Sequence, residues 1–158
     1  MNIHAPSVNA RDLEKILADV QVAVAQVIIA TVLRHYPTAQ AVYLFGSLAA
    51  GEAWPDSDAD IAVLLPPAEA KQATSLLFSP CAFELAERLK REVDLLNLRQ
   101  LSTVFQVQVI AANCLLHAAD QAAAEEFEML ALSFYQKLNE ERAEILKDFR
   151  RTKRAWPV

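Results

Sequence analysis

Glycine is scarce in this sequence: Gly46 and Gly51 are the only two among 158 residues. Because both lie in one short stretch, the backbone there is expected to need glycine's freedom, at unusual φ values or close to a ligand. Cysteine is equally scarce, and Cys81 and Cys114 show no C-x-x-C type of metal-ligand spacing. Two such thiols are typical of a protein kept in a reducing cytoplasm.

A basic balance of charge is also missing. The net charge is −5, whereas proteins that grip duplex nucleic acid along its phosphates are usually basic, so direct nucleic-acid binding is not expected. Residues 1–11 lack the basic region and apolar core of a signal peptide. The apolar run at 20–33 is too short to span a bilayer. These features predict a cytoplasmic protein without a membrane role.

The composition is that of a globular protein, with 54% hydrophobic and 22% charged residues. A chain of this length suits one compact domain with its own core. We therefore expect a single domain over 1–158, with its core at about 12–118 and a C-terminal helix at about 121–151.

Hydrophobic periodicity predicts alternating helices and short strands. Helices are expected at 12–35, at 68–91 with a break at Pro80, at 102–113 and at 121–151; strands are expected at 41–45, 58–65 and 92–98, with an edge strand at 114–118. This order describes an α+β domain in which a small mixed β-sheet packs against helices. The apolar stripes of the two long helices are expected to face the core, leaving a few apolar side chains for a partner surface: Val22, Ile29, Met129 and Leu146.

Gly46-Ser47 follows directly after the first expected strand. Backbone N–H groups in such a turn can form an anion-binding nest, and the Ser47 hydroxyl adds a further donor. The pair is therefore a candidate binding site for a triphosphate.

Asp58-Ala59-Asp60 opens the next strand, and ten residues, 48–57, separate it from Ser47. Side chains alternate along a strand, so Asp58 and Asp60 point to the same face. Two neighbouring carboxylates repel each other, and a divalent cation removes that cost. The Asp-x-Asp pair is therefore a candidate Mg²⁺ site of the two-metal kind.

The third strand supplies a further acid. Asp94 lies within an apolar run, where an unpaired carboxylate is costly. If this strand lies beside the one that begins at Asp58, Asp94 completes a cluster of three carboxylates. Glu92 shares its face and is the rival candidate, although it sits at the polar entrance of the strand next to Arg91.

These motifs together resemble the DNA polymerase β-type nucleotidyltransferase superfamily. The likeness runs from the Leu44-Phe45-Gly46-Ser47 segment through the Asp-x-Asp pair to the later Val93-Asp94-Leu95 strand. In detail the chain resembles the minimal nucleotidyltransferases that act as antitoxins beside HEPN-domain toxins. The combination of Gly-Ser and Asp-x-Asp in a strand–loop–strand context carries the specificity.

The resemblance implies transfer of AMP from ATP to an acceptor hydroxyl with release of pyrophosphate. In the antitoxin group the acceptor is a tyrosine of the partner toxin, an RNase that the modification silences. Gly46 and Ser47 would then hold the triphosphate, and Asp58 and Asp60 would bind both Mg²⁺ ions. Asp94 would bind one ion and help to deprotonate the attacking hydroxyl.

The sequence departs from the family pattern in the loop. Leu48 and Ala50 stand where the family often has arginines that could pair with phosphate oxygens. This departure favours one alternative, an antitoxin that works by contact alone with a weakened site. A separate alternative is a nucleotidyltransferase acting on a small molecule such as an aminoglycoside, but the short chain argues against it, since that chemistry usually needs an added domain to shape the acceptor pocket. The basic tail is compatible with an acidic partner surface and with a solvated helix end: Lys147, Arg150, Arg151, Lys153 and Arg154.

Overall fold

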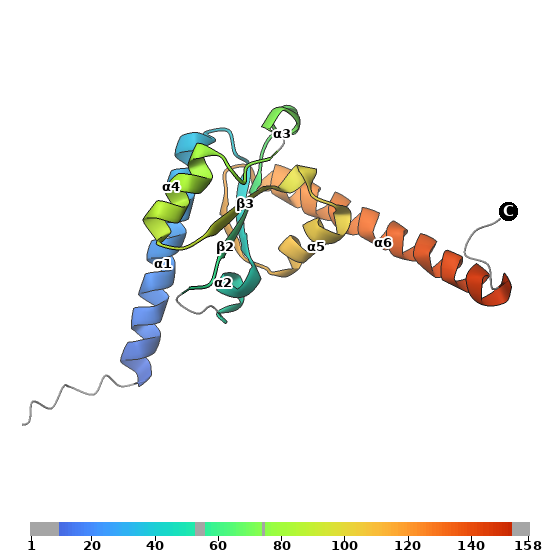
Figure 1. Ribbon diagram of the computed structural model, residues 1–158, viewed down its shortest axis with the longest axis horizontal. Coiled ribbons are helices and arrows are strands. Elements are labelled where there is room, and N and C mark those ends of the chain that lie inside the picture. Colours follow the sequence, from blue (N-terminus) through green and yellow to red (C-terminus); the bar gives the residue numbers. More distant parts are fainter. Residues whose placement is uncertain (1–9, 53–55, 74, 153–158) are drawn as a thin grey trace, which may run out of the picture.

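The computed structural model describes residues 10–52, 56–73 and 75–152. Six helices, a short 3-10 turn and four strands follow one another along these ranges (Figure 1). Their bounds are α1 Ala10–His35, β1 Ala41–Phe45, α2 Gly46–Ala50, β2 Ala59–Leu64, α3 Pro67–Ala73, α4 Pro80–Leu89, β3 Val93–Asn97, η1 Leu98–Gln100, α5 Thr103–Ala111, β4 Leu115–Ala118 and α6 Gln121–Thr152. Lys153 and Arg154 of the basic tail lie outside the described residues.

The four strands form one mixed sheet in the order β3-β2-β1-β4. β1 pairs with both β2 and β4 in antiparallel fashion, while β2 and β3 are parallel. The predicted α+β fold is confirmed, and the 114–118 segment is an edge strand as expected. The parallel pairing of β2 with β3 brings together the two strands that carry the candidate acids.

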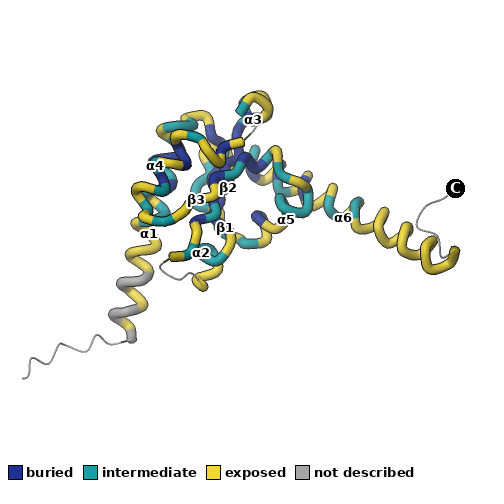
Figure 2. The backbone as a smooth tube through the Cα atoms, in the orientation of Figure 1, coloured by how far each residue is buried: buried dark blue, intermediate teal, exposed yellow. Residues whose placement is uncertain are grey.

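Each face of the sheet is covered by two helices (Figure 1). Val42, Leu44 and Ile61 point to the face covered by α1 and α4, whereas Tyr43 and Ala62 point to the face covered by α5 and α6. This alternation follows from the two-residue period of a strand. The buried residues accordingly gather in the sheet and in the helix faces turned toward it (Figure 2).

Helix α4 begins at a side-chain cap. The Ser79 hydroxyl accepts a hydrogen bond of 3.2 Å from the Ala82 N–H, and Pro80 occupies the first turn of α4. Pro80 therefore opens this helix, because a proline is tolerated where its missing N–H has no partner. The segment expected as one broken helix is thus two helices, α3 and α4, separated by turns.

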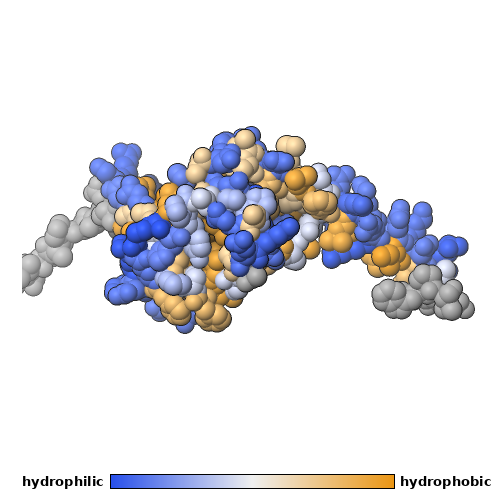
Figure 3. All heavy atoms as spheres, turned by 90° about the horizontal axis from the view of Figure 1, so that it is seen from above, coloured by the Kyte–Doolittle hydropathy of each residue, from blue (hydrophilic) through white to orange (hydrophobic). Residues whose placement is uncertain are grey.

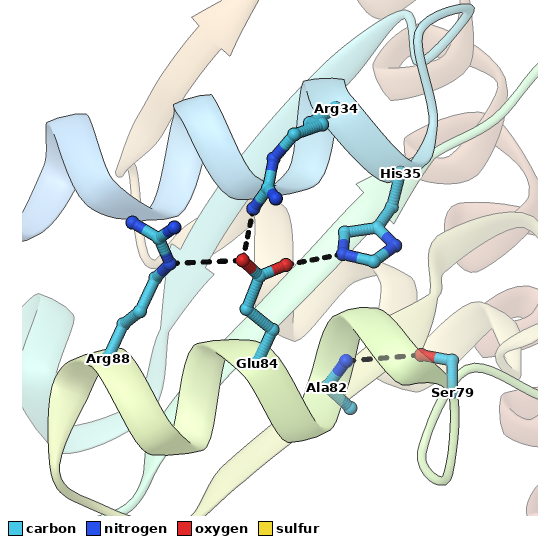
Figure 4. Close-up of polar contacts among 6 residues, drawn as sticks. All are labelled: Arg34, His35, Ser79, Ala82, Glu84 and Arg88. Carbon is cyan, nitrogen blue, oxygen red and sulfur yellow. Dashed lines mark hydrogen bonds and ion pairs between the residues drawn. The ribbon is translucent and has the colours of Figure 1, made fainter.

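A charged cluster joins α1 to α4 (Figure 4). The Glu84 carboxylate accepts hydrogen bonds from Arg34 and, at 3.1 Å, from Nε of Arg88, and its second oxygen lies 2.5 Å from Nε2 of His35. These partners lower the pKa of Glu84 to about 2, the Arg34 and His35 bonds contributing most. The cluster stabilises the contact between two helices on the same face of the sheet.

Both long helices extend beyond the core (Figure 2). In α1 the buried positions fall late, at Ile28, Thr31 and Val32, whereas Val20 and Val22 are more than half exposed. The expectation that the stripe of this helix faces the core is therefore wrong at Val20, whereas the exposure of Val22 agrees with its place among the apolar residues expected outside the core. By length and composition alone, the window Ala18–His35 is apolar enough to cross a membrane, with 17% of it buried; its second half is already packed against the sheet.

Candidate active site

The Gly-Ser segment forms the start of a short helix and not the open turn expected from sequence. Phe45 ends β1, and α2 begins at once with Gly46, whose φ is 70°. Gly51 ends the helix at φ 71°, with its N–H directed to the Ser47 carbonyl. Both glycines thus occupy left-handed backbone, as their scarcity predicted. The first N–H groups of such a helix have no partner within it.

Gly46 lies directly against the carboxylate of Asp60. A Cβ atom at residue 46 would stand 2.1 Å from Oδ2 of Asp60, closer than any real contact. The antiparallel register explains the proximity, because Asp60 is the partner of Phe45, the residue just before the glycine. The absence of a side chain at position 46 therefore lets a carboxylate reach the beginning of α2.

Asp94 lies alongside Asp60 on the neighbouring strand. In the parallel pairing of β2 and β3 the register matches Asp60 with Asp94. Both project to the sheet face that Ala62 and Leu96 help to form, the face covered by α5 and α6. Asp60 is partly buried, while Asp94 is exposed. The structure thus brings together the acids of the two strands, as expected from the sequence.

Electrostatics link all three aspartates. The pKa of the Asp60 carboxyl is raised, first by burial and then by the negative charges of Asp94 and Asp58. Asp58 is exposed and immediately precedes β2. Glu92, the rival acid, does not contribute to this shift; its backbone carbonyl accepts a 2.9 Å hydrogen bond from the Ala59 N–H. A site that raises the pKa of a carboxyl through like charges favours a bound cation.

The three carboxylates are neighbours without being gathered at one point. Among the described side chains, no three His, Cys, Asp or Glu residues are grouped closely enough to hold a metal ion. Asp58 and Asp94 are the exposed members of the three, and Asp60 is partly buried. The site has the oxygen donors that Mg²⁺ prefers, on adjacent positions of two strands and beside the start of α2.

This arrangement has counterparts among known proteins. The family model described as polymerase beta, nucleotidyltransferase matches residues 28–122, which include β1, α2, β2 and β3. The chain belongs to this nucleotidyltransferase family. The matched region contains every residue of the candidate site, from the Gly-Ser pair to the third aspartate.

One curated relative of this nucleotidyltransferase is the protein adenylyltransferase MntA of Shewanella oneidensis. The two are 37% identical over 114 residues, which are 72% of this chain and 78% of MntA. The chain is thus a homologue of an antitoxin nucleotidyltransferase.

Solved toxin–antitoxin structures match as well. A mutant MntA–HepT complex, with two aspartates at a spacing of two replaced by glutamates, has a TM-score of 0.61 at 32% identity, covering 80% of this chain and 98% of that one. A toxin–antitoxin complex with AMP-PNP has a TM-score of 0.57 at 35% identity, and the match covers 78% of this chain and 96% of that one. A complex of a tri-AMPylated Shewanella oneidensis HEPN toxin with an MNT antitoxin has a TM-score of 0.57 at 32% identity. The match covers 82% of this chain and 98% of that one.

Leu48 and Ala50, the two residues that depart from the family loop pattern, line a cavity beside α2. Leu48 packs against the hydrophobic core on the α1 side of the sheet. Together with Ala50 it lines a cavity of about 340 Å³. The other lining residues come from α1, the end of α2 and the sheet: Val20, Gln21, Val24, Ala25, Leu44, Ala49, Gly51, Arg91, Cys114 and Leu116. Helix α2 of this nucleotidyltransferase therefore turns Gly46 toward the carboxylates and Leu48 toward an apolar cavity.

Sequence reasoning missed the role of Arg91. Its Nη1 atom donates a 3.2 Å hydrogen bond to the backbone carbonyl of Ser57, the residue before Asp58. Arg91 stands just before β3, so it ties the segment carrying Asp58 to the strand carrying Asp94. Nothing in its local sequence distinguishes it from a surface arginine, because the contact joins residues that are 34 positions apart.

Proposed function

We propose that this nucleotidyltransferase is an antitoxin that transfers AMP from ATP to a tyrosine hydroxyl of a partner HEPN RNase toxin and thereby silences it. The observation that carries the proposal is the contact of Asp60 with Gly46 at the start of α2, with Asp94 at the paired position of the next strand. The relatives support the chemistry: one is named a protein adenylyltransferase, one complex holds AMP-PNP, and one contains an AMPylated HEPN toxin.

Asp58, Asp60 and Asp94 are the residues that we assign to two Mg²⁺ ions. Asp58 and Asp60 would hold both ions, and Asp94 would hold one. The raised pKa of Asp60 supports the assignment. Burial and the negative charges of Asp94 and Asp58 destabilise its ionised form, and a bound cation would stabilise that form. When bound, Mg²⁺ offsets the charge of the triphosphate and of the leaving pyrophosphate.

The chain's own residues would position the substrate and move one proton. Gly46 and Ser47, at the start of α2, would hold the triphosphate through backbone N–H groups and the Ser47 hydroxyl. The acceptor oxygen forms a bond to the α-phosphorus of ATP, the bond from that phosphorus to the bridging oxygen breaks, and pyrophosphate leaves. Asp94 would accept the proton of the acceptor hydroxyl. The need for ATP as substrate is consistent with a reaction in the cytoplasm.

The test is transfer of label from ATP carrying a labelled α-phosphate. The chain, Mg²⁺ and the HEPN protein encoded beside it are incubated together, and the expected result is a labelled HEPN protein with a modified tyrosine. Removing Mg²⁺ with a chelator, or replacing Asp58→Ala and Asp60→Ala together, is expected to abolish labelling. Labelling that persists in the double variant would overturn the assignment, and an unlabelled HEPN protein would overturn the function.

A second candidate is an antitoxin that neutralises its partner by contact alone. Leu48 and Ala50 favour it, because both line an apolar cavity and offer no cation to the phosphates. If the chain acts by contact alone, the Asp58→Ala/Asp60→Ala variant is expected to protect cells from the toxin as well as the unaltered chain does. Loss of protection together with loss of AMP transfer would exclude it.

A further inference from the structure

The face of α6 that is buried against the domain continues, uncovered, along the rest of the helix. Ala124, Phe127 and Ala131 of α6 are buried. Beyond them the same face carries four large apolar side chains, which we call the arm stripe: Phe134, Leu138, Ile145 and Phe149. Three of the four are 45–61% exposed. Apolar atoms are visible along this projecting part of the helix (Figure 3).

The last turns of α6 project from the domain with their apolar face exposed. Every described residue from 139 to 152 is exposed, so the last turns of α6 touch nothing else in the described chain. The projecting segment, 132–152, is about 30 Å long at ~1.5 Å per residue. Helices in water owe most of their stability to the packing of an apolar face. The arm stripe is such a face, without a surface to pack on.

The order of residues in the arm stripe is symmetric about its centre. Phe134 and Ile145 are eleven positions apart, and so are Leu138 and Phe149; this is a repeat of ~3.67 residues per turn that keeps a stripe on one side of a nearly straight helix. The midpoint of both outer and inner pairs falls between Glu141 and Arg142. Two copies laid antiparallel about that point would place Phe134 against Phe149 and Leu138 against Ile145.

The charges at the centre complete the symmetry. Glu141 and Arg142 interrupt the apolar stripe at its midpoint, and both are exposed. In the antiparallel arrangement the glutamate of each copy faces the arginine of the other, giving two equivalent ion pairs across the axis. A parallel arrangement would instead place like charges opposite each other.

We propose that two copies of this chain associate through an antiparallel pair of α6 helices, with the two-fold axis between residues 141 and 142. The arm stripes cover each other, and the reciprocal pairs of Glu141 with Arg142 fix the register and direction. A two-fold interface uses the same patch on both copies, which is what the self-complementary order of this stripe provides. The proposal is independent of the nucleotidyltransferase site, because that site is built on β2, β3 and the start of α2.

The experiment uses two charge-reversal variants of the full chain, singly and mixed. Glu141→Arg places two arginines on each side of the axis, and Arg142→Glu places two glutamates there. Each alone is expected to sediment as a monomer where the unaltered chain is a dimer. An equimolar mixture of the two is expected to recover the dimer, because every arginine then faces a glutamate. The double variant Glu141→Arg/Arg142→Glu is also expected to dimerise.

The control is Glu140→Arg, a reversal on the far side of the helix, which is expected to leave the dimer intact. Ile145→Asp, within the arm stripe, is expected to give a monomer. A chain that is monomeric at all concentrations would overturn the proposal. So would a dimer unaffected by Ile145→Asp, or single variants that fail to recover each other. If the arm stripe is covered only when the HEPN protein is added, with no homodimer alone, the stripe belongs to that protein and the proposal is wrong.

Discussion

The carboxylate of Asp60 lies against the backbone of Gly46, so that strand β2 and the first residue of α2 share one small space. Gly51, five residues on, has almost the same φ, but a Cβ atom there would have nothing within 4 Å. The two glycines therefore separate two effects: left-handed backbone at both, and close approach of a carboxylate at only one.

Gly46→Ala is expected to lose AMP transfer and stability together. An alanine at left-handed φ costs about 1–2 kcal/mol, and the collision with Asp60 adds roughly 1–3 kcal/mol of crowding. The carboxylate must move to relieve it, which displaces it from the start of α2. Denaturant unfolding and α-labelled ATP transfer measure both effects.

Gly51→Ala is the matched control for that variant. It carries the backbone cost of about 1–2 kcal/mol without the collision, so it is expected to unfold earlier than the unaltered chain while still transferring AMP when folded. Equal stability losses in the two variants, with equal activity, would show that the Gly46–Asp60 contact has no consequence for the site.

The charged cluster around Glu84 predicts a pH-dependent stability. The pKa of Glu84 is lowered to about 2 by Arg34, His35 and Arg88, compared with about 4.3 in an unfolded chain. A lowered pKa in the folded state contributes stability that is present above the unfolded pKa and lost as pH falls through the folded one. Glu84→Gln is therefore expected to lower the melting temperature at pH 7, and this difference is expected to shrink as the pH falls from about 4.5 to about 2.

Glu87→Gln, an exposed position on the same helix, is the control for Glu84. Its melting temperature is expected to follow that of the unaltered chain across the same pH range. A constant difference between Glu84→Gln and the unaltered chain at every pH would mean that the carboxylate contributes through packing and not through its charge.

Arg91 is expected to position the segment that carries Asp58. Replacing Arg91→Met removes the hydrogen bond to the Ser57 carbonyl, and a loss of ~1.5 kcal/mol in the placement of that segment corresponds to roughly tenfold slower transfer. Arg91→Lys keeps a donor and is expected to recover part of the rate. Steady-state transfer against ATP concentration separates kcat from KM, and a change confined to stability, with both constants intact, would reject this role.

Much of the site could be predicted because its parts are local. The Gly-Ser pair directly follows β1, and Asp60 lies in β2 with Asp58 immediately before that strand. The preference for Asp94 over Glu92 stays a prediction; the parallel register of β2 and β3 places Asp94 opposite Asp60, a long-range pairing that the sequence does not give. Arg91 escaped prediction because its contact is with a backbone carbonyl far along the chain, and carbonyls carry no residue-type signal.

The two long helices show where periodicity alone misleads. A stripe of apolar residues indicates that a helix face is covered, but not by what. In α6 the face is buried at Phe127 and open at Phe134 and Ile145, because the domain is too small to cover a helix of 32 residues. The short helix α2 was missed for the opposite reason: its five residues give too little pattern to recognise.

In the proposed reaction, acids from two neighbouring strands act together beside the start of α2. The most direct measurement compares AMP transfer to the HEPN protein by Asp94→Asn and by Glu92→Gln, two neutralisations that differ by two residues on the same strand face. We expect Asp94→Asn to reduce the transfer rate by at least about a hundredfold, as for loss of a group acting on metal and proton, while Glu92→Gln transfers normally. Normal transfer by Asp94→Asn, or loss of transfer by Glu92→Gln alone, would contradict the claim.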